Sequence, residues 1–313
     1  MKSNNLILLL FLSILFNLHA QNNDPIIYDL KSEHLVNPIG LDNITPRLTW
    51  KIRDSNRGAQ QKSYKIFVGI DSTNVASGKG SHWNTGKIDK DDQLVIYNGR
   101  KLEAFQKYYW SVTVLDSENN EIRANSIASF EMGMIDIKNW KGSWISDSRD
   151  IDKKESPYFR KEFNIQKKIK RARIYIATAG LFELSVNGKR VGNHQLDPTF
   201  TRFDRRILYV THDVTNLLKQ NNAIGVLLGN GWFNHQSTAV WYFHKSPWRA
   251  RPMFCLDLKV IYEDGSEETF SSNTDWKNSS GSVLFNSIYT AEHQNAQLEQ
   301  KGWNKYGFDD DNW

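Results

Sequence analysis

The sequence predicts an all-β protein built as two β-sandwich domains, and three observations lead to this prediction. After residue 25, short runs of alternating apolar and polar residues recur along the chain, with little helical periodicity. Clusters of turn-forming residues separate these runs. The stretch 133–142 differs in character from both sides, so we place one domain at 25–133 and a second at 140–313.

The first domain contains four predicted strands with clear patterns. Residues 48–52 and 64–70 are rich in β-forming side chains. Residues 108–115 give the clearest alternation, because Tyr108, Trp110, Val112 and Val114 fall on one face of a strand. Residues 126–132 form the last strand of the set. Short strands with regular turn breaks indicate a β-sandwich.

The second domain has stronger turn signals. Asn187-Gly188 tolerates the positive φ angles of a type I′ turn, so residues 181–193 are predicted to form a hairpin. Residues 259–270 repeat this pattern around Asp264-Gly265. Residues 213–218 resemble a capped helical turn, and 223–228 read as a buried strand. These elements predict a second, larger sandwich of the jelly-roll type.

The N-terminus indicates export. Lys2 gives a positive start, residues 6–16 are apolar except for Ser13, and Ala20 offers a cleavage point. We therefore expect a signal peptide at 1–20 and a periplasmic or secreted protein; the alternative is a buried core helix. The apolar stretch is too short to span a bilayer, and no later segment could do so.

Composition excludes several functional classes. The formal charge of +5 is spread over the chain without a long basic patch, so we expect no nucleic-acid partner. A single cysteine, Cys255, excludes an internal disulfide, a cysteine-rich zinc site and a paired redox motif. Its apolar neighbours predict a small core residue.

We find no catalytic motif. The chain lacks a glycine-rich phosphate loop, an HExxH zinc motif, a GxSxG nucleophile and a calcium-loop pattern. Most paired carboxylates lie at turns or at the terminus, where solvation explains them. Glu292 stands without a visible partner, so we assign no catalytic residue.

An aromatic segment is the strongest candidate for a binding surface. Residues 232–248 contain six rings, and Trp241-Tyr242-Phe243 places three in succession, so at least one ring should face away from the core. Rings stack on the C–H faces of sugars, while amide, imidazole and guanidinium groups bond hydroxyls. The alternative is that the rings belong to the core or contact a neighbouring domain. The candidates for sugar binding or domain contact are Trp232, Phe233, His235, Trp241, Tyr242, Trp248, Arg249 and Arg251.

The second half resembles the N-terminal carbohydrate-binding-like module of bacterial α-L-rhamnosidases of glycoside hydrolase family 78. The similar stretches are 179–192, 196–198, 209–218, 227–233, 247–252, 298–303 and 307–313. The first half resembles the fibronectin type III-like domain that precedes this module, through residues 37–40, 46–50, 83–87 and 108–112. The chain departs from the family at Gln294-Asn295-Ala296-Gln297, where Tyr-Asp-Ala-Arg is frequent, so any role of those two charges is in doubt.

The resemblance implies hydrolysis of terminal α-L-rhamnosides with inversion, by two carboxylates in an (α/α) barrel that this chain does not contain. The implied partners are a rhamnose-containing glycan and the missing C-terminal barrel, and the chain alone should be inactive. The alternatives are a stand-alone carbohydrate-binding or adhesion protein, or a structural spacer.

We expect no cofactor, although some sugar-binding modules of this enzyme class use calcium. Oxygen-rich side chains that could hold it follow the 181–193 hairpin, and their alternative roles are in turns and caps. These calcium candidates are Asn193, Asp197 and Asp204.

Overall fold

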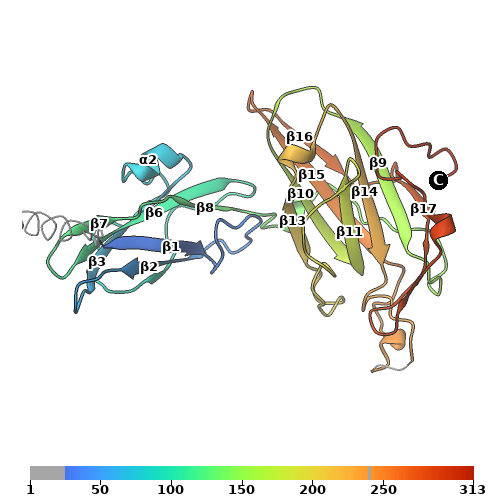
Figure 1. Ribbon diagram of the computed structural model, residues 1–313, viewed down its shortest axis with the longest axis horizontal. Coiled ribbons are helices and arrows are strands. Elements are labelled where there is room, and N and C mark those ends of the chain that lie inside the picture. The colour runs from blue at the N-terminus through green and yellow to red at the C-terminus, as the bar shows by residue number, and fades with distance from the viewer. Residues whose placement is uncertain (1–24, 239–240) are drawn as a thin grey trace, which may run out of the picture. The chain divides into compact units, whose positions relative to one another are not determined.

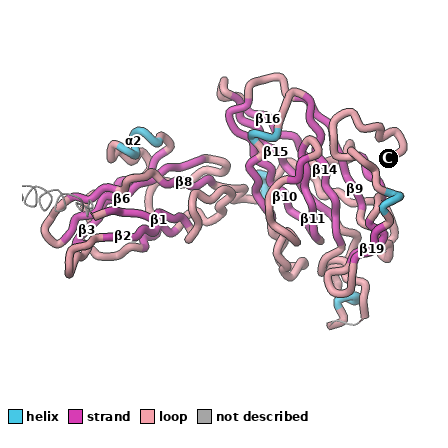
Figure 2. The backbone as a smooth tube through the Cα atoms, viewed as in Figure 1, coloured by secondary structure: helices cyan, strands magenta, loops and turns pink. Residues whose placement is uncertain are grey.

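The computed structural model describes residues 25–238 and 241–313, and it divides into two compact units at Ile135 and Asp136. The predicted signal peptide lies outside the described residues. Strands and loops make up nearly all of the tube in Figure 2, which confirms the all-β prediction. Within the described ranges, the structure contains no helix long and apolar enough to cross a membrane.

The first unit consists of two antiparallel sheets (Figure 1). The smaller sheet has the order β1-β2-β5. The larger has the order β4-β3-β6-β7, and β8 also pairs with β6. The elements are β1 (Ile26–Ser32), β2 (Arg47–Arg53), β3 (Gln61–Gly69), α2 (Ser72–Ala76), β4 (Trp83–Asn84), β5 (Leu94–Ile96), β6 (Lys107–Asp116), β7 (Glu121–Arg123) and β8 (Ala128–Glu131).

The core of the first unit lies between these sheets, and the alternation in β6 explains it. Tyr108, Trp110, Val112 and Val114 are all almost fully buried, as their common face predicts. The indole N–H of Trp110 donates to the Ser32 hydroxyl at 3.0 Å, so its polar edge is satisfied inside the core.

The second unit is also a sandwich, built from a four-stranded sheet and a five-stranded sheet with a small hairpin beside them. The four-stranded sheet has the order β13-β10-β15-β16, the five-stranded sheet β12-β11-β14-β9-β17, and the hairpin joins β18 and β19. The strands are β9 (Pro157–Asn164), β10 (Ile169–Ala179), β11 (Leu181–Val186), β12 (Lys189–Arg190), β13 (Tyr209–Asp213), β14 (Asn221–Gly229), β15 (Met253–Tyr262), β16 (Glu267–Ser271), β17 (Lys277–Ser280), β18 (Val283–Asn286) and β19 (Glu292–Gln294).

The turn predictions for this unit are confirmed. Asn187 and Gly188 have φ angles of 53° and 78°, as a type I′ turn requires, and they join β11 to β12. The Asp264-Gly265 turn joins β15 to β16. The short 3₁₀ helices of the second unit are η1 (Ile137–Asn139), η2 (Thr215–Leu217), η3 (Phe243–Lys245) and η4 (Ala296–Leu298), and η2 is the predicted helical turn.

The core of the second unit forms where the inner faces of the two sheets meet. Leu184, Val226 and Leu256 are buried there, and the Phe159 and Phe254 rings make an edge contact with centroids 5.3 Å apart. Cys255 is 4% exposed, and its thiol contacts the Gly142 carbonyl at 3.2 Å. Burial, with a smaller contribution from Asp257, raises the pKa of this thiol to about 12.

Candidate functional site

The aromatic segment belongs to the long connection between β14 and β15, and a second loop adds two rings to it. Phe200 and Phe203 come from the loop after Pro198, and the sequence analysis did not select them. Phe203 packs edge-on against Phe233 at 5.1 Å, and Phe200 lies 6.1 Å from Trp232. The sequence feature that could have indicated them is a pair of phenylalanines three residues apart in an otherwise polar loop.

Four of these rings form a cluster that we call the aromatic platform: Phe200, Trp232, Trp241 and Phe243. The Trp232 and Trp241 rings stack with centroids 6.4 Å apart and an interplanar angle of 28°. Phe243 lies 5.4 Å from Trp232 and 6.0 Å from Phe200. The four rings therefore pack against one another as a single cluster.

The predicted outward ring is present. Trp241 is 80% exposed and Tyr242 is 72% exposed, so two members of the three-ring run face away from the core. Both residues have left-handed backbone, with φ angles of 40° and 58°. Bulky residues adopt this conformation at a cost of order 1–3 kcal/mol each. The fold thus holds these two rings outward against a local conformational preference.

The other candidate rings lie deeper. Phe233 is 5% exposed and His235 is 1% exposed, whereas Trp232 and Trp248 are half-buried. Trp248 lies beneath the platform, 6.2 Å from Phe243 and 6.3 Å from Phe203. A ligand on the outer surface would therefore meet Trp241 and part of Trp232, while Phe233 and Trp248 both pack against Phe203.

The two candidate arginines bind protein groups. Arg251 donates two hydrogen bonds to Asp147, at 2.8 and 2.7 Å, and both side chains are buried. Its remaining donors reach the carbonyls of Lys153 and Glu155 at 2.7 and 3.0 Å. Arg249 donates to the Asn234 amide oxygen at 2.9 Å and pairs with Asp152. Both guanidinium groups anchor the aromatic segment to the loop 147–155.

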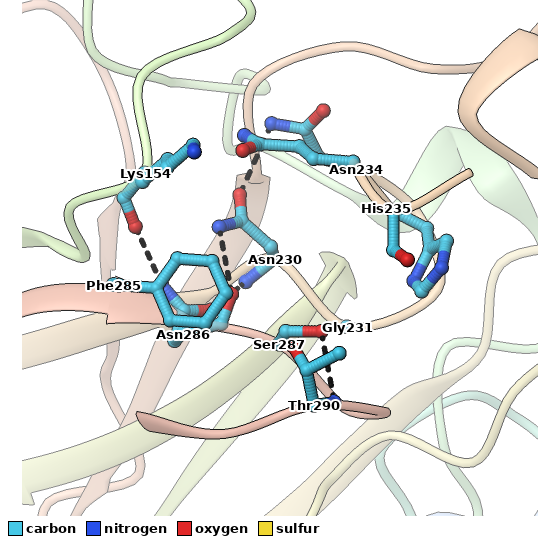
Figure 3. A pocket seen from close by; sticks show the side chains of 11 residues that line it. Lys154, Asn230, Gly231, Asn234, His235, Phe285, Asn286, Ser287 and Thr290 are labelled. Atoms are coloured by element: carbon cyan, nitrogen blue, oxygen red, sulfur yellow. Dashed lines mark hydrogen bonds between the residues drawn. The ribbon is translucent and has the colours of Figure 1, made fainter. Parts of the chain in front are cut away.

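A polar cavity of about 260 Å³ lies beside the platform, between residues 230–237 and the β18–β19 hairpin (Figure 3). Asparagine side chains in its wall form hydrogen bonds with one another and with neighbouring backbone groups. The Asn286 amide accepts from the Asn230 backbone N–H at 2.6 Å and donates to the Lys154 carbonyl at 3.1 Å. The Asn234 amide donates to the Asn230 side chain at 3.1 Å. This network fixes the shape of the wall.

His235 is the buried titratable group of the site. Neither ring nitrogen has a hydrogen-bond partner among the described residues, and the ring lies 5.3 Å from that of Trp232. Burial lowers the pKa of His235, and electrostatic interactions with His244 and Arg249 lower it further. The imidazole is therefore neutral near pH 7.

The three calcium candidates lie in the loop between β12 and β13; Asn193 is exposed, and the other two bind neighbouring side chains. Asp197 lies 3.3 Å from the His194 ring nitrogen, and Asp204 accepts from Arg202 at 2.8 and 3.0 Å. Among residues 25–238 and 241–313, no cluster of three or more histidine, cysteine or acidic side chains could hold a metal ion. The expected absence of a cofactor stays a prediction.

We predict that the exposed and the buried rings differ in their effect on stability. Trp241→Ala should change the free energy of unfolding by less than about 0.5 kcal/mol, because the ring is mostly in solvent. Phe233→Ala should cost about 3–5 kcal/mol, because it removes a buried ring and leaves a cavity beside Phe203. Urea unfolding of both variants measures this. Equal losses would contradict the arrangement of the platform.

We also predict a pH dependence from His235. The unfolded side chain has a pKa of about 6.5, and the folded pKa is lower, so unfolding takes up a proton below that pH. The free energy of unfolding should therefore fall as pH drops from about 7.5 to about 5. His235→Leu should lose less over this range, leaving the same-sign contribution of His212. Parallel curves for both proteins would contradict the prediction.

Comparison with known proteins identifies the two units. Residues 27–136 match the Rha78A-like N-terminal immunoglobulin domain, and residues 167–313 match the alpha-L-rhamnosidase N-terminal domain. An immunoglobulin domain shares the two-sheet sandwich architecture of the predicted fibronectin type III-like domain.

Individual relatives agree with these matches. An alpha-L-rhamnosidase of Formosa agariphila is 30% identical over 320 residues, which cover 93% of this chain and 33% of the relative. The structure of the alpha-L-rhamnosidase from Dictyoglumus thermophilum superposes with a TM-score of 0.84 at 35% identity, over 92% of this chain and 33% of that one. The enzyme from Aspergillus terreus gives 0.78 at 28% identity, over 91% of this chain and 33% of that one.

This chain thus spans about a third of the length of these relatives. At residues 27–136 and 167–313, it carries two domains that are found in the N-terminal part of alpha-L-rhamnosidases.

Proposed function

We propose that the chain is the non-catalytic N-terminal portion of an α-L-rhamnosidase that removes terminal α-L-rhamnose from glycans or glycosides. The observation that carries this proposal is the match of nearly the whole described chain to one third of such enzymes. The catalytic groups then belong to the remainder, and this portion positions or binds substrate. The apolar segment at 6–16 supports export to the periplasm or the medium.

The carboxylates of this chain support a non-catalytic role. An inverting glycosidase holds an acid and a base about 6.5–9.5 Å apart around the scissile bond. Glu183 and Glu292 both line a groove of about 470 Å³ on the second unit, but both are exposed. Glu292 accepts a hydrogen bond from Gln294, and Glu183 lies 3.8 Å from Arg190. Neither has the buried surroundings that raise the pKa of a general acid.

We further propose that the aromatic platform is a contact surface, for a sugar or for the catalytic portion. The support is the exposure of Trp241 and Tyr242, whose left-handed backbone would otherwise be an uncompensated cost. A pyranose ring can lie on the stacked indoles of Trp232 and Trp241. This surface also favours the second candidate function, a stand-alone carbohydrate-binding or adhesion protein.

We predict that the purified chain does not hydrolyse an aryl α-L-rhamnoside. Release of the coloured phenol is measured at high protein concentration, with the full-length enzyme as the positive control. Residual turnover in the chain should be unaffected by Glu183→Gln and Glu292→Gln, since a contaminant would cause it. Turnover that either substitution abolished would show that this portion is catalytic.

We predict that Trp241→Ala weakens binding of a rhamnose-containing oligosaccharide about 5–30-fold, since one buried ring contributes about 1–2 kcal/mol. Calorimetry on this chain measures the affinity, and Trp144→Ala is the matched control because its ring is 45% exposed elsewhere.

If the platform contacts the catalytic portion instead, the chain alone shows no binding heat. Trp241→Ala then lowers the melting temperature of the full-length protein but not of this chain. A variant that behaves as wild type in both experiments would contradict a contact role.

A further inference from the structure

The last residues of the second unit, 299–313, form a segment that we call the C-terminal strap. The whole of this segment is described, and it contains neither a helix nor a strand. It lies across the outer face of the five-stranded sheet. Asn304 donates to the Ser185 hydroxyl of β11 at 3.0 Å, and Lys277 of β17 donates to the Asp310 carboxylate at 2.6 Å.

One buried guanidinium makes three polar contacts to the strap, with the Trp303 and Lys305 carbonyls and the Asp310 carboxylate. Arg160 of β9 is 1% exposed, and its Nε donates to the Trp303 carbonyl at 2.8 Å. Its Nη2 donates to the Lys305 carbonyl at 3.0 Å and to Glu162, and its Nη1 pairs with Asp310.

Glu162 extends this contact, because its carboxylate also accepts the Gly307 backbone N–H at 2.8 Å. The Phe308 ring lies 5.5 Å from the centre of the Arg160 guanidinium. Two strap carbonyls, those of Trp303 and Lys305, therefore bond to a single side chain, while the Asn304 carbonyl accepts from the Gly188 backbone N–H at 2.9 Å.

Ring stacking fixes the same segment beside Arg160. Tyr158 of β9 stacks on Trp303 with centroids 4.6 Å apart, and Trp303 stacks on Trp313 at 6.2 Å. The Gln300 amide accepts from the Trp313 indole at 2.9 Å and donates to the Ser280 carbonyl at 2.7 Å. The strap is thus a compact layer of side-chain contacts on the sheet.

Gly225 makes this close approach possible. It lies mid-strand in β14, opposite Arg160 and Ser185. A Cβ there would lie 2.7 Å from Trp303, Asn304 and Ser185. The absence of a side chain therefore leaves room for the strap.

The strap covers only one end of the sheet face. Further along β11 and β14, Leu181 and Leu227 form part of the wall of the open groove of about 470 Å³. Leu227 pairs with Glu183 and Tyr158, two residues along the strands from the covered row of Ser185, Gly225 and Arg160 and on the same face of the sheet. The covered and open parts thus belong to one continuous surface.

We propose that the strap is a movable cover over this sheet face and that Arg160 is its latch. Release of the strap breaks side-chain bonds, ring stacks and the backbone bond from Gly188 to Asn304, but no strand pairing, so it requires less free energy than unfolding of the sandwich. Release also extends the open groove along β11 and β14. This inference does not depend on the proposed hydrolase function.

Arginine is required at this position by its geometry. A planar guanidinium presents fixed donors in several directions and bonds two carbonyls and two carboxylates at once. A lysine ammonium has one nitrogen and cannot reach the Trp303 and Lys305 carbonyls together with both acids. Arg160→Lys therefore keeps the charge and removes the latch.

Hydrogen exchange of this chain, followed by mass spectrometry, tests the proposal. In the wild-type chain, strap amides such as those of Trp303 and Lys305 should exchange faster than the amides of β10 and β15. Arg160→Lys should accelerate strap exchange at least about tenfold and leave β10 and β15 unchanged. Arg202→Lys, an exposed arginine paired with Asp204, is the matched control and should change neither.

A second pair of variants tests the strap without changing any charged residue. Gly225→Ala should displace Trp303 and accelerate strap exchange, whereas Gly229→Ala in the same strand has its nearest neighbours at 3.5 Å and should not. The proposal is overturned if the strap and β10 exchange together in the wild type. It is also overturned if Arg160→Lys and Gly225→Ala both leave strap exchange unchanged, or if either variant exposes β10 in step with the strap.

Discussion

Arg251 and Asp147 carry opposite charges into the interior of the second unit, and the candidate site depends on their pairing. An isolated buried charge costs several kcal/mol, but the two parallel bonds compensate it, and the Lys153 and Glu155 carbonyls accept the remaining donors. This arrangement fixes the loop 147–155. Other side chains then use carbonyls of the fixed loop as acceptors: Asn234 uses Ile151, Gln236 uses Lys153, and Asn286 uses Lys154.

Local pattern was sufficient to predict much of the sandwich. Alternation in 108–115 indicates which face points into the core, and Tyr108, Trp110, Val112 and Val114 are buried as it predicts, although Ser111 and Thr113 of the other face are buried as well. Asn187-Gly188 encodes a turn through its own backbone preference. The burial of Arg160 could not be predicted in this way, because an arginine in the middle of a strand is expected to face solvent. Its burial comes from strap residues about 145 positions later, a contact that no local pattern contains.

The same distinction applies to the site. Composition alone selected the six-ring segment, and strand alternation predicted at least one outward ring. The adjacent rings of Trp241 and Tyr242 both face outward because this part of the chain is a turn with left-handed backbone and not a strand. Phe200 and Phe203 were missed because they join the cluster from another loop. Arg251 was selected as a possible sugar ligand, yet the structure engages its guanidinium with Asp147, a partner 104 residues away. The type of a side chain indicates which ligand groups it could bind, whereas tertiary contacts decide whether its donors are free to bind a ligand.

The burial of Cys255 has a practical consequence. It is the single cysteine of the sequence, it is 4% exposed, and burial raises the pKa of its thiol to about 12. Alkylating reagents attack the thiolate, so the native chain offers almost none at neutral pH. A cysteine introduced at a surface position would then be the one reactive thiol. Fluorophores or spin labels can therefore be attached selectively without first replacing a native residue.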